Sequence, residues 1–176
     1  AGGLAAAVLL PEIYALQMTA SGDFKFPQTV TSYFSIFDML ARHMANVQTE
    51  IGLNHWPNIY CGTAVLMFAL LYFGCRTVPV REKAVYGVML FLFFASFSVN
   101  VLNFIWHGFH YPNSLPCRQS FIYIALMLTL CYKAYASLDS VPLKRVMLAF
   151  WAAGGFVILA EKLVDNPEQY HFSVFY

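Results

Sequence analysis

The side chains best suited to chemistry gather in one stretch of the sequence, NFIWHGFHYPNSLPCRQSF at residues 103–121. It places His107, His110, Asn113 and Arg118 between aromatic residues and prolines. Prolines remove backbone donors and fix turns, so we expect these side chains to be held in place. An arginine offers a planar pair of donors to a phosphate, and a histidine donates a hydrogen bond or moves a proton near neutral pH. The stretch therefore predicts a site for an amphipathic ligand that carries a phosphate.

The same stretch has a second interpretation in which it binds no specific ligand. Trp106, Phe109 and Tyr111 are the residue types of an aromatic belt at a membrane interface, and Arg118 would then meet lipid headgroups. Residue types alone leave both interpretations open.

A metal or haem site is not predicted. His107 and His110 are three residues apart, but Gly108 and Pro112 interrupt a helix there. Zinc sites need three or four ligands, and a bis-histidine haem needs ligands on facing helices. The remaining histidines lie outside every span predicted below: His43, His55 and His171. We therefore expect no cofactor.

The elements that position this stretch follow from the composition. Of 176 residues, 60% are hydrophobic and 11% are charged, whereas a soluble domain is about 45–50% apolar and about 25% charged. The formal net charge of +1 gives no long-range field for a nucleic acid. Long uncharged stretches approach the roughly 20 residues with which a helix crosses a bilayer. The sequence therefore predicts a membrane protein without a nucleic-acid partner.

The predicted fold is all-α, a polytopic transmembrane bundle of about five spanning helices. The first span, residues 1–18, carries Pro11 and Glu12, and an ionisable group inside a span is functional by default unless it pairs within the bundle. Since no repeat or linker divides the chain, residues 1–176 are expected to be part of one transmembrane domain. The other spans are expected at residues 57–75, 83–106, 119–138 and 146–164, with outer loops at 19–56, 107–118 and 165–176.

The loop charges predict the orientation, because lysine and arginine are retained on the cytoplasmic side. The loop at 107–118 carries a single such residue, Arg118. It is therefore expected on the outer side. The connections expected on the cytoplasmic side carry more lysine and arginine residues: Arg76, Arg81, Lys83, Lys144 and Arg145, with Lys133 adjacent.

The first outer loop predicts a short amphipathic helix in the plane of the outer interface. Asp38 and Arg42 lie on its polar face, four residues apart, and predict an ion pair. This helix either caps the bundle or guides a substrate. Its expected apolar face consists of Tyr33, Phe34, Ile36, Phe37, Leu40, Met44 and Val47.

The start of the chain and its cysteines set the remaining expectations. Ala1 begins an apolar run with no basic region and no cleavage site, so we expect an internal piece of a longer protein. The four cysteines lack metal-ligand spacing and are expected to be packing thiols. The alternative is a disulfide between Cys61 and Cys117, which share the predicted outer side.

A family resemblance rests on three motifs. The run HGFHYPNSLPCRQSF at residues 107–121 resembles the signature loop of the bacterial YfhO family of polytopic membrane proteins. PNIYCG at residues 57–62 and REK at 81–83 match further elements in the expected order. The sequence departs from the pattern at Cys117, where an aromatic residue is usual.

The resemblance implies a protein similar to the GT-C superfamily of glycosyltransferases, of which this chain would form one portion. Such enzymes take a sugar from a polyprenyl-phosphate carrier at the outer face of the bacterial plasma membrane, and YfhO-like proteins are associated with envelope polymers such as teichoic acids. Their catalytic base is a carboxylate, typically in the first outer loop of the full protein. No Asp-Asp or Asp-Glu pair occurs in this chain, so the base is expected outside it.

The expected contacts with the donor follow from this resemblance and from residue type. Arg118 and His110 would bind the phosphate, and His107 and Asn113 would bind the sugar or support the site. Tyr60 and Glu12 are further candidates for substrate contact.

A transporter or lipid-handling protein without transferase activity is the alternative. It would favour charges near the midplane, whereas here the polar residues gather at the outer rim, Glu12 excepted. An acidic pair upstream would favour the enzyme, and an inverted repeat would favour the transporter.

Overall fold

A computed structural model describes residues 2–19, 26–45, 47–52, 54–109 and 115–165 of the chain. Within these residues the fold is all-α, as predicted, and its one β-bridge pairs Ser32 with Val99. The elements are α1 (Gly2–Gln17), α2 (Ile36–Ala41), α3 (Val65–Gly74), α4 (Val80–Ser98), α5 (Asn100–Trp106), α6 (Ser120–Ala136), the short 3₁₀-helix η2 (Leu138–Ser140) and α7 (Leu143–Leu163).

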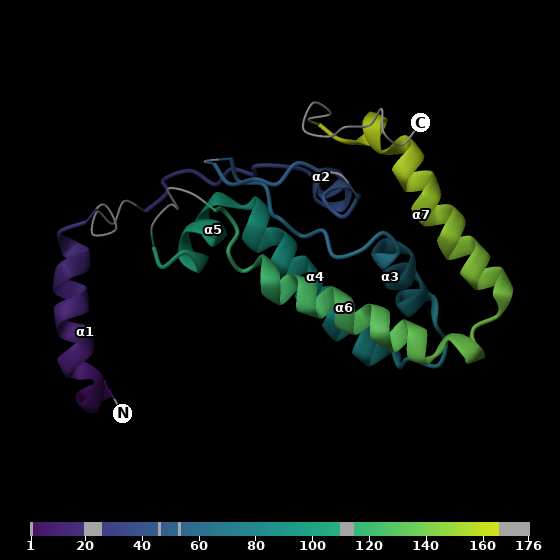
Figure 1. The fold of residues 1–176 in the computed structure, drawn as a ribbon, viewed down its shortest axis with the longest axis horizontal. Coiled ribbons are helices and arrows are strands. Elements are labelled where there is room, and N and C mark those ends of the chain that lie inside the picture. Colours follow the sequence, from purple (N-terminus) through teal and green to yellow (C-terminus); the bar gives the residue numbers. More distant parts are fainter. Residues whose placement is uncertain (1, 20–25, 46, 53, 110–114, 166–176) are drawn as a thin grey trace.

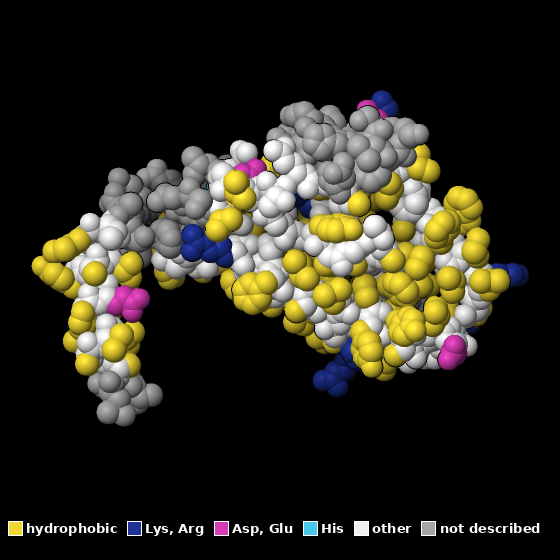
Figure 2. Space-filling view, viewed as in Figure 1, with side chains coloured by type: hydrophobic (Ala, Val, Ile, Leu, Met, Phe, Trp, Pro, Cys, Tyr) yellow, Lys and Arg dark blue, Asp and Glu magenta, His cyan; other side chains and the backbone are white. Residues whose placement is uncertain are grey.

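The helices form a bundle in which neighbours in space are often distant in sequence. Helix α3 packs against α6 and α7, and α4 packs against α5 and α6, while α2 lies on α7 (Figure 1). Helix α1 stands apart from the bundle, at the end of the molecule opposite α7 (Figure 1). Apolar side chains cover much of the visible face of the bundle, and most lysine and arginine side chains lie at its margins (Figure 2).

The observed helices differ from the predicted spans in their bounds. Among the described residues, α7 alone is long and apolar enough to cross a membrane. Helix α4 has 19 residues but begins with Arg81, Glu82 and Lys83. Helix α3 begins eight residues after Pro57, since the residues between them form an irregular segment that ends in a turn. The five predicted crossings therefore remain a prediction.

The predicted span 83–106 is two helices rather than one. Val99 has an extended backbone (φ −88°, ψ 123°) between α4 and α5. The segment before α2 binds this break: the Tyr33 amide donates to the Ser98 carbonyl over 2.9 Å, and the Asn100 amide donates to the Thr31 carbonyl over 3.1 Å. Asn100 also donates through Nδ2 to the Thr29 carbonyl over 2.7 Å. These bonds satisfy backbone groups that a continuous helix would have paired internally.

The amphipathic helix predicted in the first outer loop is shorter than expected, and its polar side is buried as well. Ser35 and Asp38 form a capping box that starts α2. Asp38 is fully buried and Arg42 is 4% exposed, whereas Ile36 and Phe37 are exposed. The assignment of Asp38 and Arg42 to a solvated face was therefore wrong, because α2 is covered from its polar side by distant segments of the chain.

One end of the bundle is held together by polar contacts between helices. The Glu82 carboxylate of α4 accepts from Lys133 of α6 over 2.9 Å and from the Tyr72 hydroxyl of α3 over 3.0 Å. Arg145 of α7 donates to the Gly74 carbonyl over 2.8 Å. Lys133 and Arg145, which are among the basic residues predicted on the cytoplasmic side, thus both lie at this end of the bundle.

Candidate functional site

The stretch that the sequence predicts as the ligand site lies at the opposite end of the bundle, between α5 and α6. His107 ends α5 and is 8% exposed, and its Nδ1 lies 2.8 Å from the Asn103 carbonyl oxygen. Arg118 is exposed in the turn before α6. His110 and Asn113 lie outside the described residues. Of the four residues predicted here, the structure therefore places His107 and Arg118.

The backbone flanking this loop is strained. Phe109, Leu115 and Cys117 have positive φ angles of 64°, 51° and 54°. Non-glycine residues adopt this region at a cost and only where their surroundings hold them there.

Buried polar groups lie beneath the loop. Asn103 is fully buried and donates through Nδ2 to the Cys117 Sγ over 3.8 Å, and the Cys117 thiol donates to the His55 carbonyl over 3.5 Å. Burial lowers the pKa of His55, and nearby His107 acts in the same direction. The Oδ1 of Asn103, the Nδ1 of His55 and the Nε2 of Gln119 have no hydrogen-bond partner within the described part of the chain. Such groups are costly to bury unless a water or a ligand bonds to them.

All four cysteines are free thiols, so Cys61 and Cys117 are not joined. Burial raises the pKa of Cys117 to about 12, although the Asn103 hydrogen bond and the Arg42 charge act to lower it. Cys117 is therefore a packing thiol that lies within electrostatic reach of Arg42.

Tyr60, a predicted contact residue, is 47% exposed and lines a small cavity of about 220 Å³. The other lining residues are Arg42, Val47, Thr49, Asn58 and Ile59. The cavity brings Tyr60 together with Arg42, a residue that sequence reasoning had assigned to an exposed helix face.

Arg42 is fixed by segments that follow it in the chain. Its Nε donates to the Pro57 carbonyl over 3.0 Å, and its Nη2 donates to the Asn58 Oδ1 over 3.0 Å. Asn58 in turn accepts from the Glu50 amide over 2.9 Å and donates to the Glu50 carbonyl over 2.7 Å. The guanidinium is therefore oriented by groups that are themselves held.

His43, next to Arg42, joins α2 to α6. Its Nδ1 lies 3.2 Å from the Met39 and Leu40 carbonyls, and its Nε2 lies 2.9 Å from the Tyr123 hydroxyl. Burial lowers the pKa of His43 to about 4, which outweighs the opposite effect of the two carbonyls. The imidazole is thus neutral near pH 7, with Nδ1 donating to the carbonyls and Nε2 accepting from Tyr123.

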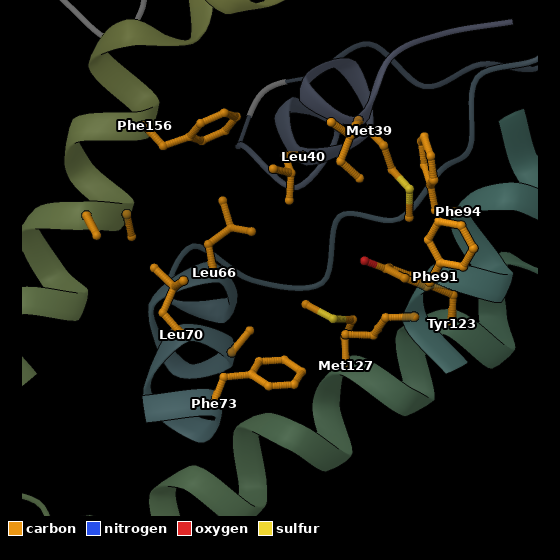
Figure 3. A pocket seen from close by; sticks show the side chains of 15 residues that line it. Met39, Leu40, Leu66, Leu70, Phe73, Phe91, Phe94, Tyr123, Met127 and Phe156 are labelled. Atoms are coloured by element: carbon orange, nitrogen blue, oxygen red, sulfur yellow. The ribbon is translucent and has the colours of Figure 1, made fainter. Parts of the chain in front are cut away.

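A large apolar cavity of about 500 Å³ lies between α2, α3, α4, α6 and α7. Side chains from all five helices point into it, and the Tyr123 hydroxyl is the polar group that they include (Figure 3). They are Ile36, Met39, Leu40, Leu66, Ala69, Leu70, Phe73, Leu90, Phe91, Phe94, Tyr123, Met127, Ala152, Ala153 and Phe156. The cavity suits a hydrocarbon chain.

Glu12, the remaining candidate, is not brought to either cavity. It is exposed on α1, which stands apart from the bundle (Figure 1). In the described part of the chain, no group of three or more histidines, cysteines or acidic residues is arranged to hold a metal ion.

The residues that sequence reasoning missed are Arg42, His43 and Tyr123. The signal was present in part, because Arg42 and His43 are adjacent polar residues in an otherwise apolar segment. Their burial depends on contacts with residues 57–58 and with α6, which no local pattern reveals.

Comparison with known proteins gives one match. A family model described as bacterial membrane protein YfhO matches residues 1–174. No curated protein and no solved structure matches the chain.

Proposed function

This chain belongs to the YfhO family of bacterial membrane proteins, and from that premise we propose that it is part of a glycosyltransferase that uses a polyprenyl-phosphate-linked sugar. The reaction takes place at the outer face of the plasma membrane. The acceptor is a cell-envelope polymer such as teichoic acid. The chain crosses the membrane several times in this proposal.

The apolar cavity between α2, α3, α4, α6 and α7 is the observation that carries the proposal. Its volume of about 500 Å³ and its aliphatic and aromatic walls suit a segment of an isoprenoid chain. Polar groups lie beside this cavity. Tyr123 of α6 lines it and pairs with His43, which lies two residues after the end of α2. This arrangement suits a lipid that places its hydrocarbon chain in the cavity and its headgroup next to these polar groups.

The chemistry calls for stabilisation of a leaving phosphate. The acceptor hydroxyl oxygen bonds to the anomeric carbon while the bond from that carbon to the phosphate oxygen breaks. The acceptor proton passes to a carboxylate base, which the family resemblance places elsewhere in the intact protein. The polyprenyl phosphate leaves with added negative charge, which cations and donors at the interface stabilise. We assign Arg118 and His110 to this phosphate, and His107 and Asn113 to the sugar or to hydrogen bonds that support the site.

The test narrows the cavity without touching the polar groups. Ala152 is exposed and lines the cavity, and Ala125 is exposed on α6 and does not line it. In the intact protein, Ala152→Phe should lower transfer from a long-chain donor roughly tenfold, because a phenyl group occupies space that the chain needs. Ala125→Phe should leave transfer unchanged. The measurement is sugar transferred from a radiolabelled polyprenyl-phosphate donor to purified envelope polymer.

Two results would contradict the proposal in different ways. Equal activity of the two variants would remove the cavity from donor binding. Absence of transfer by the intact protein, together with retained binding of polyprenyl phosphate, would indicate lipid handling without transfer.

A further inference from the structure

We propose that a groove between α3 and α7 binds an anionic phospholipid, with Arg145 in contact with its phosphate. The groove lies at the basic end of the bundle, away from the loop between α5 and α6. The inference does not rest on sugar transfer.

The groove has apolar walls and is open to the surroundings of the bundle. Helices α3 and α7 pack side by side (Figure 1), and the space between them has a volume of about 410 Å³. Leu70 and Leu148 line it and are 45% and 70% exposed. The other apolar side chains of the lining are Leu71, Ala149 and Ala152. An exposed apolar surface of this kind on a membrane protein suits an acyl chain.

Arg145 supplies the charged side chain of the lining. It is partly buried, and its Nη1 donates to the Gly74 carbonyl over 2.8 Å. This acceptor is neutral, and among the described contacts no carboxylate pairs with Arg145. The first turn of α7, to which Arg145 belongs, contains no acidic residue. The guanidinium is therefore a cation without an anionic partner in the described chain, and its planar set of donors fits the oxygens of a phosphate.

The surroundings of Arg145 add positive charge. The two connections at this end of the bundle, residues 75–83 and 137–145, contain five basic and two acidic residues. The acids are the exposed Asp139 and Glu82, which already pairs with a lysine of α6 over 2.9 Å. The basic residues are Arg76, Arg81, Lys83, Lys144 and Arg145. An anion that binds here would offset an excess of positive charge.

The start of α7 favours an anion for a second reason. The N-terminal turn of a helix is the place for acidic side chains, because the helix dipole is positive there. Helix α7 instead carries Lys144 and Arg145 in its first turn. These two cations and the helix dipole repel one another unless an anion from outside the chain lies between them.

A lipid fits these features better than a free anion. The apolar walls with a cation at one end match a molecule with a hydrocarbon chain and a charged headgroup, whereas a free phosphate leaves the walls uncovered. Basic pockets between helices on the cytoplasmic side of membrane proteins bind anionic headgroups, and the loop charges predict this end on that side. Phosphatidylglycerol is a probe with this chemistry.

The test titrates the intact protein in detergent with defined lipids and measures the bound lipid by native mass spectrometry. Phosphatidylglycerol should bind about fivefold more tightly than phosphatidylcholine of the same chain length, because the choline cation opposes the basic surroundings. Arg145→Gln should weaken phosphatidylglycerol binding about tenfold. The glutamine amide can still donate to the Gly74 carbonyl, so the contact between α3 and α7 is kept.

A second variant tests the groove without changing the charge. Gly74 lines the groove, and a Cβ built on it meets no other side chain within 4 Å. Gly74→Leu should therefore fold and should weaken phosphatidylglycerol binding about tenfold, because the added side chain occupies space that the acyl chain needs. Neither Gly74 nor Arg145 lines the apolar cavity assigned to the donor.

Each variant has a matched control. Arg81→Gln removes an exposed charge at the same end of the bundle and outside the groove. Ala125→Leu adds a side chain on the exposed face of α6, also outside the groove. Both should bind phosphatidylglycerol like the native protein. Glycerol phosphate at millimolar concentration should not compete, because it lacks the acyl chain.

Four results would overturn the proposal. They are equal binding of the two lipids, Arg145→Gln binding like Arg81→Gln, Gly74→Leu binding like Ala125→Leu, and effective competition by glycerol phosphate. The same spectra report the mass of the protein, and a dimer that holds no lipid would mean that a second copy of the chain covers the groove instead. Sugar transfer enters none of these measurements, so the proposed function and this inference can fail separately.

Discussion

Arg118 is exposed in the turn before α6, at the end of the bundle where His107 is buried. If it contacts the leaving phosphate, Arg118→Ala should slow transfer about a hundredfold or more, a loss of about 2–4 kcal/mol of transition-state stabilisation. Arg118→Lys should also slow it, because the charge remains but the planar pair of donors is lost. The measurement is sugar on the envelope polymer in a strain that lacks the native protein.

The control for Arg118 is Arg76→Ala, at an exposed arginine near the opposite end of the bundle. All variants are compared at equal abundance in the membrane. An arginine that only touches lipid headgroups tolerates lysine with little loss. Full glycosylation with Arg118→Ala would exclude Arg118 from the site and would leave His107 and His110 as the remaining candidates.

Single residues show what sequence could and could not predict about the site. The interruption between the helices that end near His107 and begin after Arg118 was predictable, because Gly108 and the prolines of this stretch break a helical pattern. Arg42 was not, since a helical pattern gives the spacing of its faces but not which face later segments cover. Its position depends on Pro57 and Asn58, about 15 residues further along the chain.

At the scale of elements, the Asn100 side chain supports the break between α4 and α5, together with the backbone bonds from Tyr33 to Ser98 and from Asn100 to Thr31. Asn100 is 7% exposed, and its amide group binds the Thr29 carbonyl, the Thr31 amide and the Val101 amide. Asn100→Ala leaves these groups without their partner and should lower the free energy of unfolding by about 2–3 kcal/mol. The thermal unfolding midpoint of the detergent-solubilised protein checks this.

Asn54→Ala is the comparison for Asn100, because Asn54 is exposed and bonds only locally to Glu50 in the described contacts. It should change the midpoint little. Equal midpoints for the two variants would mean that the segment before α2 does not hold the break.

The bounds of the helices also depend partly on the local sequence and partly on contacts with distant segments. Helices α6 and α7 were predicted within a few residues, because their apolar runs end at prolines, charges or polar turns. The break at Val99 lies inside an uncharged run, between Ser98 and Asn100, and arises from bonds to residues 29–34, more than 60 residues earlier. The polar residues at this point do not by themselves show that the helix ends there.

At the scale of the whole molecule, the placement of charge predicts an orientation that can be measured. Leu115 and Val80 are exposed and lie at opposite ends of the bundle. In a cysteine-free background, a membrane-impermeant thiol reagent should label Leu115→Cys in intact cells and should label Val80→Cys only after permeabilisation, because the basic end faces the cytoplasm. The reverse labelling pattern would contradict the predicted orientation. Both cavities would then lie toward the inner leaflet, which does not fit a reaction at the outer face.

The size of the apolar cavity sets how a donor can bind in a bilayer. The cavity of about 500 Å³ is partly open, so its apolar walls meet whatever surrounds the bundle. In a membrane, acyl tails of ordinary lipids fill such a space. If the proposed donor binds here, one hydrocarbon chain exchanges for another, so the hydrophobic contributions to binding largely cancel. Selection among lipids falls to the polar groups beside α2, and the abundance of competing bilayer lipids sets the apparent affinity.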